Sequence, residues 1–206
     1  MQIALATACG YLIGSVPVGL IVTRLLRGVD VRDYGSGKTG FTNTLRVLGL
    51  RRSLPVFLGD LGKGLVAALL PLLYSDDPWA RAAGGLAAVV GHVWPVFAGF
   101  RGGRGVLTGA GVLLALDPVA CLVAVPFALA VMVATRYMSL ASITGCLAAA
   151  GAFLAFAALG WHDWAFAAAA LLGAALIIAL HHDNIDRLRR GAEPKIGRGG
   201  ERRATA

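Results

Sequence analysis

Long apolar runs, separated by short polar segments, make up most of this chain. About 20 apolar residues in a helix are enough to cross the hydrocarbon layer of a membrane. We therefore expect membrane-spanning helices over residues 1–23, 53–74, 82–100, 106–116, 118–135, 140–160 and 164–180. The fourth of these has only eleven residues, so it needs neighbouring helices or local bilayer thinning to cross.

Two of these runs contain residues that a simple lipid-facing helix lacks. Gly14, Ser15 and Pro17 interrupt the first run and predict a kink or a close approach of another helix. Asp60 and Lys63 lie one turn apart within the second run, where ionisable residues are costly and usually functional. A structural ion pair and a direct role in binding are equal interpretations of this pair at this point.

The composition agrees with a membrane protein. Of the 206 residues, 57% are hydrophobic and 15% are charged, with a mean hydropathy of +0.73, whereas soluble domains carry about 25% charged residues. We expect an all-α integral membrane protein with one membrane-embedded domain over 1–196 and a disordered basic tail over 197–206. Because aromatic residues do not interleave with the basic ones, the net charge of +8 concerns orientation and lipids rather than nucleic acid.

The cysteines and two of the histidines carry no clear chemistry. Cys9, Cys121 and Cys146 lie within apolar runs without paired spacing, so we interpret them as packing residues rather than disulfide or metal ligands. His92 and His162 are expected to be core or interfacial residues. The chain contains no HExxH or DDxxD pattern, and we expect no metal site and no cofactor.

The basic residues test the predicted topology. Seven crossings put the two chain ends on opposite sides, so that the segments 24–52, 101–104, 136 and 181–206 share one side. These segments hold 17 of the 19 Lys and Arg residues, and Arg81 alone falls on the other side. Because basic loops stay in the cytoplasm, we expect the N-terminus outside and the C-terminus in the cytoplasm.

The first polar segment combines glycines, short polar side chains and cations. Its glycines allow left-handed angles and a close approach to a ligand, and successive N–H groups in such a turn form an anion site. A short helix after the loop directs its positive end toward the same place. A solvated glycine-rich connector is an equal interpretation of the loop alone. The candidate phosphate-binding residues are Gly35, Ser36, Gly37, Lys38, Gly40, Thr42, Asn43 and Arg46.

A second glycine-basic loop and two helix ends are expected on the same face. The second loop is Arg101-Gly102-Gly103-Arg104-Gly105. Ordinary positive-inside arginines explain either loop alone, but two such loops suggest two anionic groups bound side by side. Ser139 lies at a helix start, where the simpler role is an N-cap. His181 and Asn184 lie at the end of the last apolar run.

Several motifs in one order make the chain recognisable. They are Gly14-Ser15-Val16-Pro17; Gly35-Ser36-Gly37 with Gly40, Thr42, Asn43 and Arg46; Asp60 with Lys63-Gly64; Gly91-His92 leading to Arg101-Gly102-Gly103-Arg104-Gly105; Ser139-Leu140; and His181, Asn184 and Arg187 with Glu193-Pro194. This series, which covers nearly the whole chain, resembles the bacterial acyl-phosphate-dependent glycerol-3-phosphate acyltransferase family of the PlsY type.

The resemblance implies a seven-helix enzyme of the bacterial plasma (inner) membrane, surrounded by lipids, with its active site at the cytoplasmic face. It would move a fatty acyl group from acyl phosphate to glycerol 3-phosphate, giving 1-acylglycerol 3-phosphate (lysophosphatidic acid) and phosphate, the first step of phospholipid synthesis. Ser36, Ser139, His181 and Asn184 are the expected catalytic residues. The residues of the two loops and Lys63 are expected to bind substrate.

The chain departs from the family pattern at three positions. Lys38 stands where family members usually have asparagine, and Arg101 and Arg104 stand where they usually have lysine. Arginine is a planar fork and lysine a point charge. Either can hold phosphate, so these changes bear on affinity and on substrate choice. For Lys38 two roles stay open, a further phosphate contact or a contact with lipid headgroups.

Two functions of other classes fit parts of the pattern. An anion transporter would use seven helices, but its polar groups should run through the bilayer between internal repeats, and the sequence shows neither. A non-catalytic lipid-binding protein would not need two anion loops. For the enzyme we expect direct acyl transfer, because no nucleophile elbow or Ser-His-Asp pattern is present and acyl phosphate is already activated.

Overall fold

The computed structural model describes residues 1–203, which fold almost entirely into helices. The α-helices are α1 (Gln2–Gly14), α2 (Val18–Arg27), α3 (Phe41–Leu48), α4 (Leu50–Leu69), α5 (Pro78–Val93), α6 (Val106–Leu116), α7 (Pro118–Thr135), α8 (Met138–Ala158), α9 (Trp164–Ala179) and α10 (His182–Arg189). Three short 3-10 helices, η1 (Val31–Asp33), η2 (Leu70–Leu73) and η3 (Val96–Ala98), lie in the connections.

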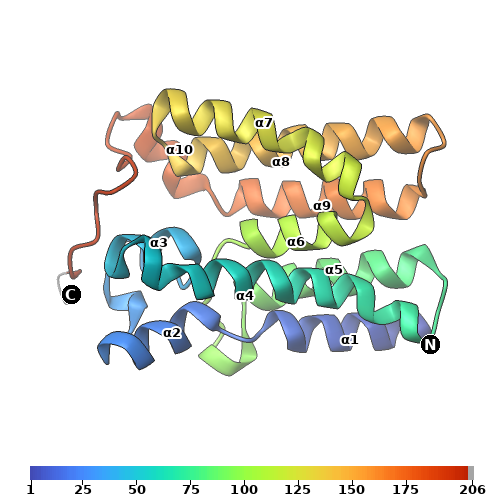
Figure 1. Ribbon diagram of the computed structural model, residues 1–206, viewed down its shortest axis with the longest axis horizontal. Coiled ribbons are helices and arrows are strands. Elements are labelled where there is room, and N and C mark those ends of the chain that lie inside the picture. Colours follow the sequence, from blue (N-terminus) through green and yellow to red (C-terminus); the bar gives the residue numbers. More distant parts are fainter. Residues whose placement is uncertain (204–206) are drawn as a thin grey trace.

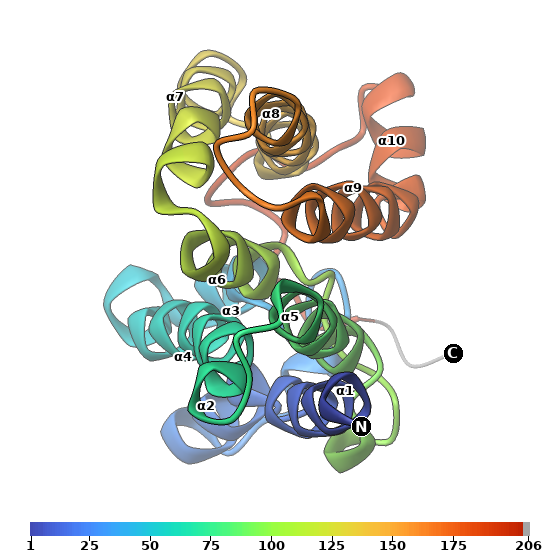
Figure 2. The ribbon, with the colours of Figure 1, turned by 90° about the vertical axis from the view of Figure 1, so that its right-hand side faces the viewer.

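The long helices lie side by side along one axis (Figure 1). Viewed along that axis, α1, α4 and α5 form one group and α7, α8 and α9 form another, with α6 between them (Figure 2). The N-terminus and the C-terminal segment lie at opposite ends of the bundle (Figure 1).

Close backbone contacts hold α6 in this central place. Gly64 on α4 faces the carbonyl of Thr108 on α6, and Gly111 on α6 faces the carbonyl of Leu61 on α4. A Cβ atom at either glycine would collide with that backbone. Small residues at such crossings allow helices to pack in lipid, where no hydrophobic driving force joins them.

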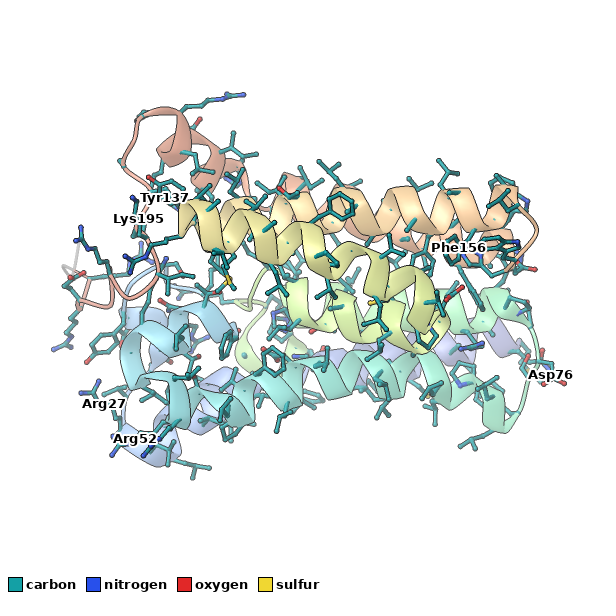
Figure 3. All side chains as sticks on the ribbon, turned by 45° about the horizontal axis from the view of Figure 1, so that its top comes forward. Arg27, Arg52, Asp76, Tyr137, Phe156 and Lys195 are labelled. Carbon is teal, nitrogen blue, oxygen red and sulfur yellow. The ribbon has the colours of Figure 1, made fainter. Side chains whose placement is uncertain are left out.

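The outside of the bundle is apolar and its ends are polar. Large hydrophobic side chains on α7, such as Leu122 and Val133, are exposed, whereas Arg27, Arg52 and Lys195 gather at one end and Asp76 at the other (Figure 3). Within residues 1–203, four helical segments are long and apolar enough to span a membrane, and α9 with α10, bent by 55°, counts as a fifth if the pair is one span. The protein is therefore an all-α integral membrane protein.

The predicted helix limits agree closely with the structure in the second half of the chain. The ranges 106–116 and 118–135 coincide with α6 and α7. The third run, by contrast, ends at Val93 instead of residue 100, because Trp94-Pro95 breaks the helix and the chain turns back into the bundle. The first run breaks at Ser15–Pro17 into α1 and α2, where the sequence predicts a kink.

The tail differs from the sequence prediction of disorder from residue 197. The Gly35 N–H donates to the Glu201 carbonyl at 3.0 Å, and the Arg203 N–H donates to the Asp33 carbonyl at 2.8 Å. Residues 197–203 therefore have a defined path over the first glycine loop. Residues 204–206 of the predicted tail lie outside the described residues.

Candidate active site

A polar cavity of about 340 Å³ lies at the basic end of the bundle. It is formed where α3, α6, α8 and α10 begin, so residues far apart in the sequence meet there. Its polar lining residues are Ser36, Lys38, Thr42, Asn43, Arg46, Asp60, His92, Arg104, Ser139, Ser142, His181, Asn184 and Glu193.

Asn43 holds the first glycine loop in shape. Its Oδ1 accepts from the Ser36 N–H at 3.0 Å, and its Nδ2 donates to the carbonyls of Val31 and Tyr34 at 3.0 Å and of Lys38 at 2.9 Å. Its side chain thus bonds to the loop backbone on every side. We expected Asn43 to bind substrate, but these contacts make it the residue that organises the loop.

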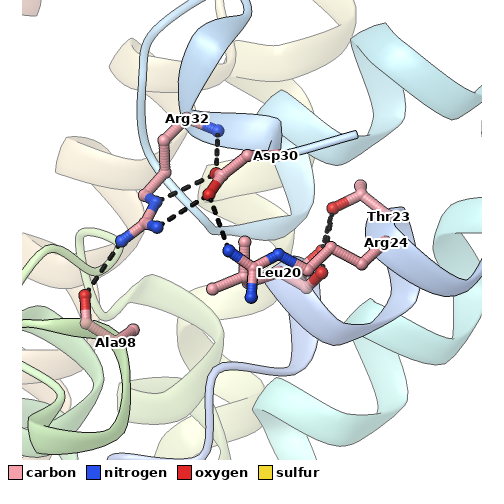
Figure 4. A network of polar contacts seen from close by, with 7 residues as sticks. Leu20, Thr23, Arg24, Asp30, Arg32 and Ala98 are labelled. Atoms are coloured by element: carbon pink, nitrogen blue, oxygen red, sulfur yellow. Dashed lines mark hydrogen bonds and ion pairs between the residues drawn. The ribbon is translucent and has the colours of Figure 1, made fainter. Parts of the chain in front are cut away.

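A salt-bridged turn ties the two glycine loops together (Figure 4). Asp30 accepts from the backbone N–H and guanidinium of Arg32 and pairs with Arg24. Arg32 also donates to the carbonyl of Ala98, just before the second loop, at 2.9 Å. The hydrogen bonds from Arg32 to the Asp30 carboxylate outweigh the opposing effect of burial and lower the pKa of Asp30 to about 2.

Two helix N-termini point at the cavity. Gly40 precedes α3, and Gly105, with φ of 85°, precedes α6. Gly40, Phe41 and Val106 line the cavity. The first-turn N–H groups of a helix have no partner within it, and together with the helix dipole they favour an anion. This agrees with the predicted phosphate site.

The second loop uses its glycines differently from the prediction. The N–H groups of Gly102 and Gly103 donate to the carbonyls of Val93 and His92, both at 3.1 Å, and so complete the end of α5. Neither glycine lines the cavity. The loop therefore contributes Arg104 and the start of α6 rather than a row of free amides.

Glu193 joins two cavity residues, Ser139 and Asn184, to Arg187, which lies outside the cavity lining. Its Oε1 accepts from Ser139 Oγ and Asn184 Nδ2, each at 2.7 Å, and its Oε2 accepts from Arg187 Nε at 2.8 Å. Burial raises the pKa of Glu193, but the hydrogen bonds from Asn184, Ser139 and Arg187 together hold it below its ordinary value. The carboxylate is therefore charged and can only accept.

This network determines which atoms face the substrate. Because the Asn184 amide nitrogen serves Glu193, its Oδ1 is left buried without a partner in the described structure. His181 Nδ1 lies 2.7 Å from the Ile177 carbonyl, so it carries the proton and the Nε2 is a free acceptor. The atoms of this group without a proton are therefore Asn184 Oδ1 and His181 Nε2, whereas Ser139 donates its proton to Glu193.

Arg46 and Arg104 supply positive charge. Arg104 Nε donates to the Leu180 carbonyl at 3.3 Å, which leaves the rest of its guanidinium toward the cavity. Burial, the largest cause, lowers the pKa of both arginines, and Glu193 partly opposes it. Arg46 Nε is buried and has no hydrogen-bond partner among the described residues. Two partly desolvated cations that lack carboxylate partners favour an anionic ligand.

Not every predicted site residue lines the cavity. Lys63 pairs with Asp60 at 2.9 Å and donates to the Val16 carbonyl at 3.0 Å, so it is a structural ion pair behind the wall. Arg101 is exposed. Of the predicted residues, the cavity brings together Ser36, Lys38, Gly40, Thr42, Asn43, Arg46, Arg104, Gly105, Ser139, His181 and Asn184, but not Gly35, Gly37, Lys63, Arg101, Gly102 or Gly103.

Sequence reasoning missed Asp60 and His92 as cavity residues. Their ionisable character inside apolar runs was the available signal, but it could not tell which face of each helix points inward. Glu193 was noted only through the family resemblance. Its position beyond the last helix gives no periodic pattern that would place it.

A second cavity, almost entirely apolar and about 250 Å³ in volume, adjoins the polar one. Val106, Leu129, Met132, Met138 and Ser142 line both. The apolar cavity extends between α6, α7, α8 and α9 toward the middle of the bundle. A ligand with a charged head and a hydrocarbon chain matches the two spaces together.

Fold and site together define a class: a multi-pass membrane protein whose anion-binding cavity, at one end of the bundle, continues into a chamber for an apolar chain.

Comparison with known proteins gives the family. Residues 4–191 match the family model described as glycerol-3-phosphate acyltransferase. The chain is 40% identical to the glycerol-3-phosphate acyltransferase of Thermoanaerobacter sp. (strain X514) over 96% of this chain and 97% of the relative. It is 42% identical to that of Parasynechococcus marenigrum (strain WH8102), over 94% and 89%.

Solved structures agree. The glycerol 3-phosphate form of PlsY (YgiH), an integral membrane glycerol 3-phosphate acyltransferase, matches with a TM-score of 0.86 and 38% identity over 96% of each chain. The lysophosphatidic acid form of PlsY matches with a TM-score of 0.83 and 37% identity over 95% of each chain. The chain belongs to the glycerol-3-phosphate acyltransferase family and is an integral membrane acyltransferase.

Proposed function

We propose that this protein transfers a fatty acyl group from acyl phosphate to glycerol 3-phosphate, giving 1-acylglycerol 3-phosphate and phosphate. The observation that carries the proposal is the pair of adjoining cavities. One is lined by arginines and by a histidine nitrogen that can accept from a hydroxyl group, and the other is apolar. Both substrates bear phosphate, and one bears a hydrocarbon chain. Relatives at about 40% identity are named for the acylation of glycerol 3-phosphate.

The residues fit an acyl transfer without an enzyme-bound intermediate. The glycerol hydroxyl attacks the acyl carbonyl carbon, a C–O ester bond forms, and the bond from that carbon to the phosphate oxygen breaks. The hydroxyl proton leaves to His181 Nε2 or to a phosphate oxygen, both of which are acceptors. Arg46, Arg104 and the starts of α3 and α6 stabilise negative charge on the departing phosphate.

Ser139 is unsuited to act as a nucleophile. Its hydroxyl donates to the Glu193 carboxylate at 2.7 Å, and Asn184 and Arg187 hold that carboxylate charged. Its proton has no path to a basic nitrogen, which is what an activated serine needs. This supports direct transfer, in which both substrates are bound together.

We further propose that the chain crosses the membrane seven times, with the basic end in the cytoplasm. The separation of Arg27, Arg52 and Lys195 from Asp76 supports this orientation (Figure 3). The polar cavity then opens where a soluble substrate arrives from the cytoplasm and a lipid-like one from the membrane.

The test is phosphate release by purified protein in detergent with acyl phosphate and glycerol 3-phosphate. We expect release that depends on both substrates, sequential kinetics, and no mass increase after incubation with acyl phosphate alone. Acyl phosphate hydrolysis that ignores glycerol 3-phosphate would contradict the transferase. An acyl adduct on Ser36 or Ser139, discharged by glycerol 3-phosphate, would contradict direct transfer only.

A further inference from the structure

His92 lines the polar cavity, although the sequence places it among core or interfacial residues. It lies at the last turn of α5 and is 5% exposed. Asp60, on α4, is 1% exposed and lines the same cavity. Neither residue is used by the acyl-transfer steps above. Two ionisable side chains buried at a cavity wall are costly unless each has a partner.

Asp60 sets the orientation of the imidazole. Asp60 Oδ1 lies 3.4 Å from His92 Nδ1 and 2.9 Å from Lys63 Nζ, and Lys63 is itself held by the Val16 carbonyl. The two atoms are at ion-pair distance without a formed hydrogen bond among the described residues, and the negative charge of Asp60 favours a proton on Nδ1. The Nε2 edge is the one that remains for the cavity.

Nε2 lies where the two glycine loops meet. A Cβ atom on Gly40 would come within 4.0 Å of Nε2, and one on Gly103 would collide with it. The loops are joined at this place, because the Thr39 N–H donates to the Gly102 carbonyl at 3.4 Å. Glycine at 103 therefore leaves the space that the ring occupies between the loops.

We propose that His92 is a further substrate-binding residue, whose Nε2–H donates to an oxygen of the phosphate group held between Gly40 and Gly105, and that Asp60 is its positioning residue. Because Nδ1 already carries a proton, Nε2 donates only when the ring is the imidazolium, a form that burial and the Lys63 ammonium oppose and that the Asp60 carboxylate and a bound phosphate favour. His92 Nε2 thus supplies a donor that Gly102 and Gly103 cannot supply, because the N–H groups of these glycines already donate to the end of α5. The inference rests on the proposed function in one respect: the proposed function supplies the two candidate ligands, the phosphate of glycerol 3-phosphate and that of the acyl donor.

Two substitutions separate binding from a purely structural role. In His92→Gln the terminal amide reaches the position of Nε2, so a donor to the ligand is kept. In His92→Asn the amide reaches only the position of Nδ1, so the contact with Asp60 is kept and the ligand contact is lost. We expect His92→Asn to raise the Kd for glycerol 3-phosphate, or for a non-hydrolysable acyl phosphate, at least tenfold, and His92→Gln to raise it less than about threefold.

Calorimetry on the intact protein in detergent gives these constants, with inorganic phosphate as the minimal probe. The ligand that weakens identifies the phosphate, and because binding needs no turnover, the result is readable even if the proposed reaction fails. Normal binding by His92→Asn, or equal losses in both variants, overturns the inference. If the variants do not fold, a structure of the unaltered protein with glycerol 3-phosphate and an acyl phosphate analogue tests the inference. We expect His92 Nε2 to lie within about 3.2 Å of a phosphate oxygen. A separation beyond hydrogen-bond distance overturns the inference.

Discussion

The direction of a few hydrogen bonds determines what the site offers its substrate. The Glu193 carboxylate can only accept, so Asn184 must turn its nitrogen to it, and Asn184 Oδ1 is left buried without a hydrogen-bond partner among the described residues. The Ile177 carbonyl orients His181 in a similar way, because it can only accept and so receives the proton on Nδ1. The family resemblance picks out these residues, but the atom that each turns toward its partner depends on residues that are distant in sequence.

Replacing Glu193 with glutamine should weaken the site in a pH-dependent way. The folded-state pKa of Glu193 lies below the ordinary value of 4.5, so its stabilisation is fully present above that pH and is lost as the pH falls through the folded pKa. At pH 7 we expect Glu193→Gln to cost about 1.5–3 kcal/mol. Thermal unfolding in detergent between about pH 3 and 7 should show the two proteins converging at low pH; a constant difference would contradict the charged network.

Arg104 and Arg101 form a matched pair of the same residue type in one loop. Arg104 lines the cavity, whereas Arg101 is exposed and outside it. Because a lost charge-assisted bond costs about 1.5–3 kcal/mol, Arg104→Ala should lower kcat/KM at least tenfold, and so should Arg46→Ala. Arg104→Lys should keep most activity, and Arg101→Ala should be close to unaltered. Equal effects at 101 and 104 would mean that the loop acts only through overall charge.

At the scale of elements, the site is a meeting of helix ends. The starts of α3, α6, α8 and α10 surround the polar cavity, and the end of α5 holds the second loop. Each start follows a glycine, a polar break or a bend that the sequence marks. Which starts meet depends on how α6 packs between the two helix groups (Figure 2).

One face of α8 should control the length of the acyl chain. Ser142, Gly145 and Ala149 line the apolar cavity, and the last lies about 10 Å beyond the first by helical rise. We expect Ala149→Leu to lower kcat/KM for long-chain acyl phosphates about tenfold, since filling a packed cavity costs about 1–3 kcal/mol, while short chains are still used.

Gly151→Leu is the control for this change. A side chain at Gly151 would meet nothing within 4 Å, and the residue is exposed. We expect its chain-length profile to be unaltered. A profile that is the same in Ala149→Leu as in the unaltered protein would show that the acyl chain lies elsewhere.

At the scale of the whole molecule, the two ends of the long helical bundle differ in charge. Arg81, the basic residue predicted on the far side, is held there by the carbonyls of Ala68 and Ala115. It completes helix ends rather than facing solvent. Its position therefore does not oppose the orientation proposed from the other basic residues.

Cysteine labelling tests this orientation. Arg52 and Asp76 are exposed at opposite ends of the bundle (Figure 3). In a background with Cys9, Cys121 and Cys146 replaced by alanine, Asp76→Cys should react with an impermeant maleimide added outside intact cells. Arg52→Cys should react only after the membrane is opened. Reaction of both sites from outside would show that the chain does not cross the membrane between residues 52 and 76, which would contradict the seven-crossing topology.

The sequence by itself determined the class of fold, the helix limits in the second half of the chain and the polar end. Continuous apolar runs such as 118–135 are enough for this, because a membrane helix satisfies its own backbone and needs no partner to be recognised. The motifs also indicated the family and most of the polar residues of the cavity. These are local or additive properties of the chain.

Only the tertiary structure decided which residues face the ligand and with which atom. It placed Lys63 behind the wall and His92 in it, used the amides of Gly102 and Gly103 to complete α5, and laid residues 197–203 over the first loop. Each outcome depends on a contact between segments far apart in the chain. Such contacts follow from helix packing, which leaves no periodic signal in the residues that make them.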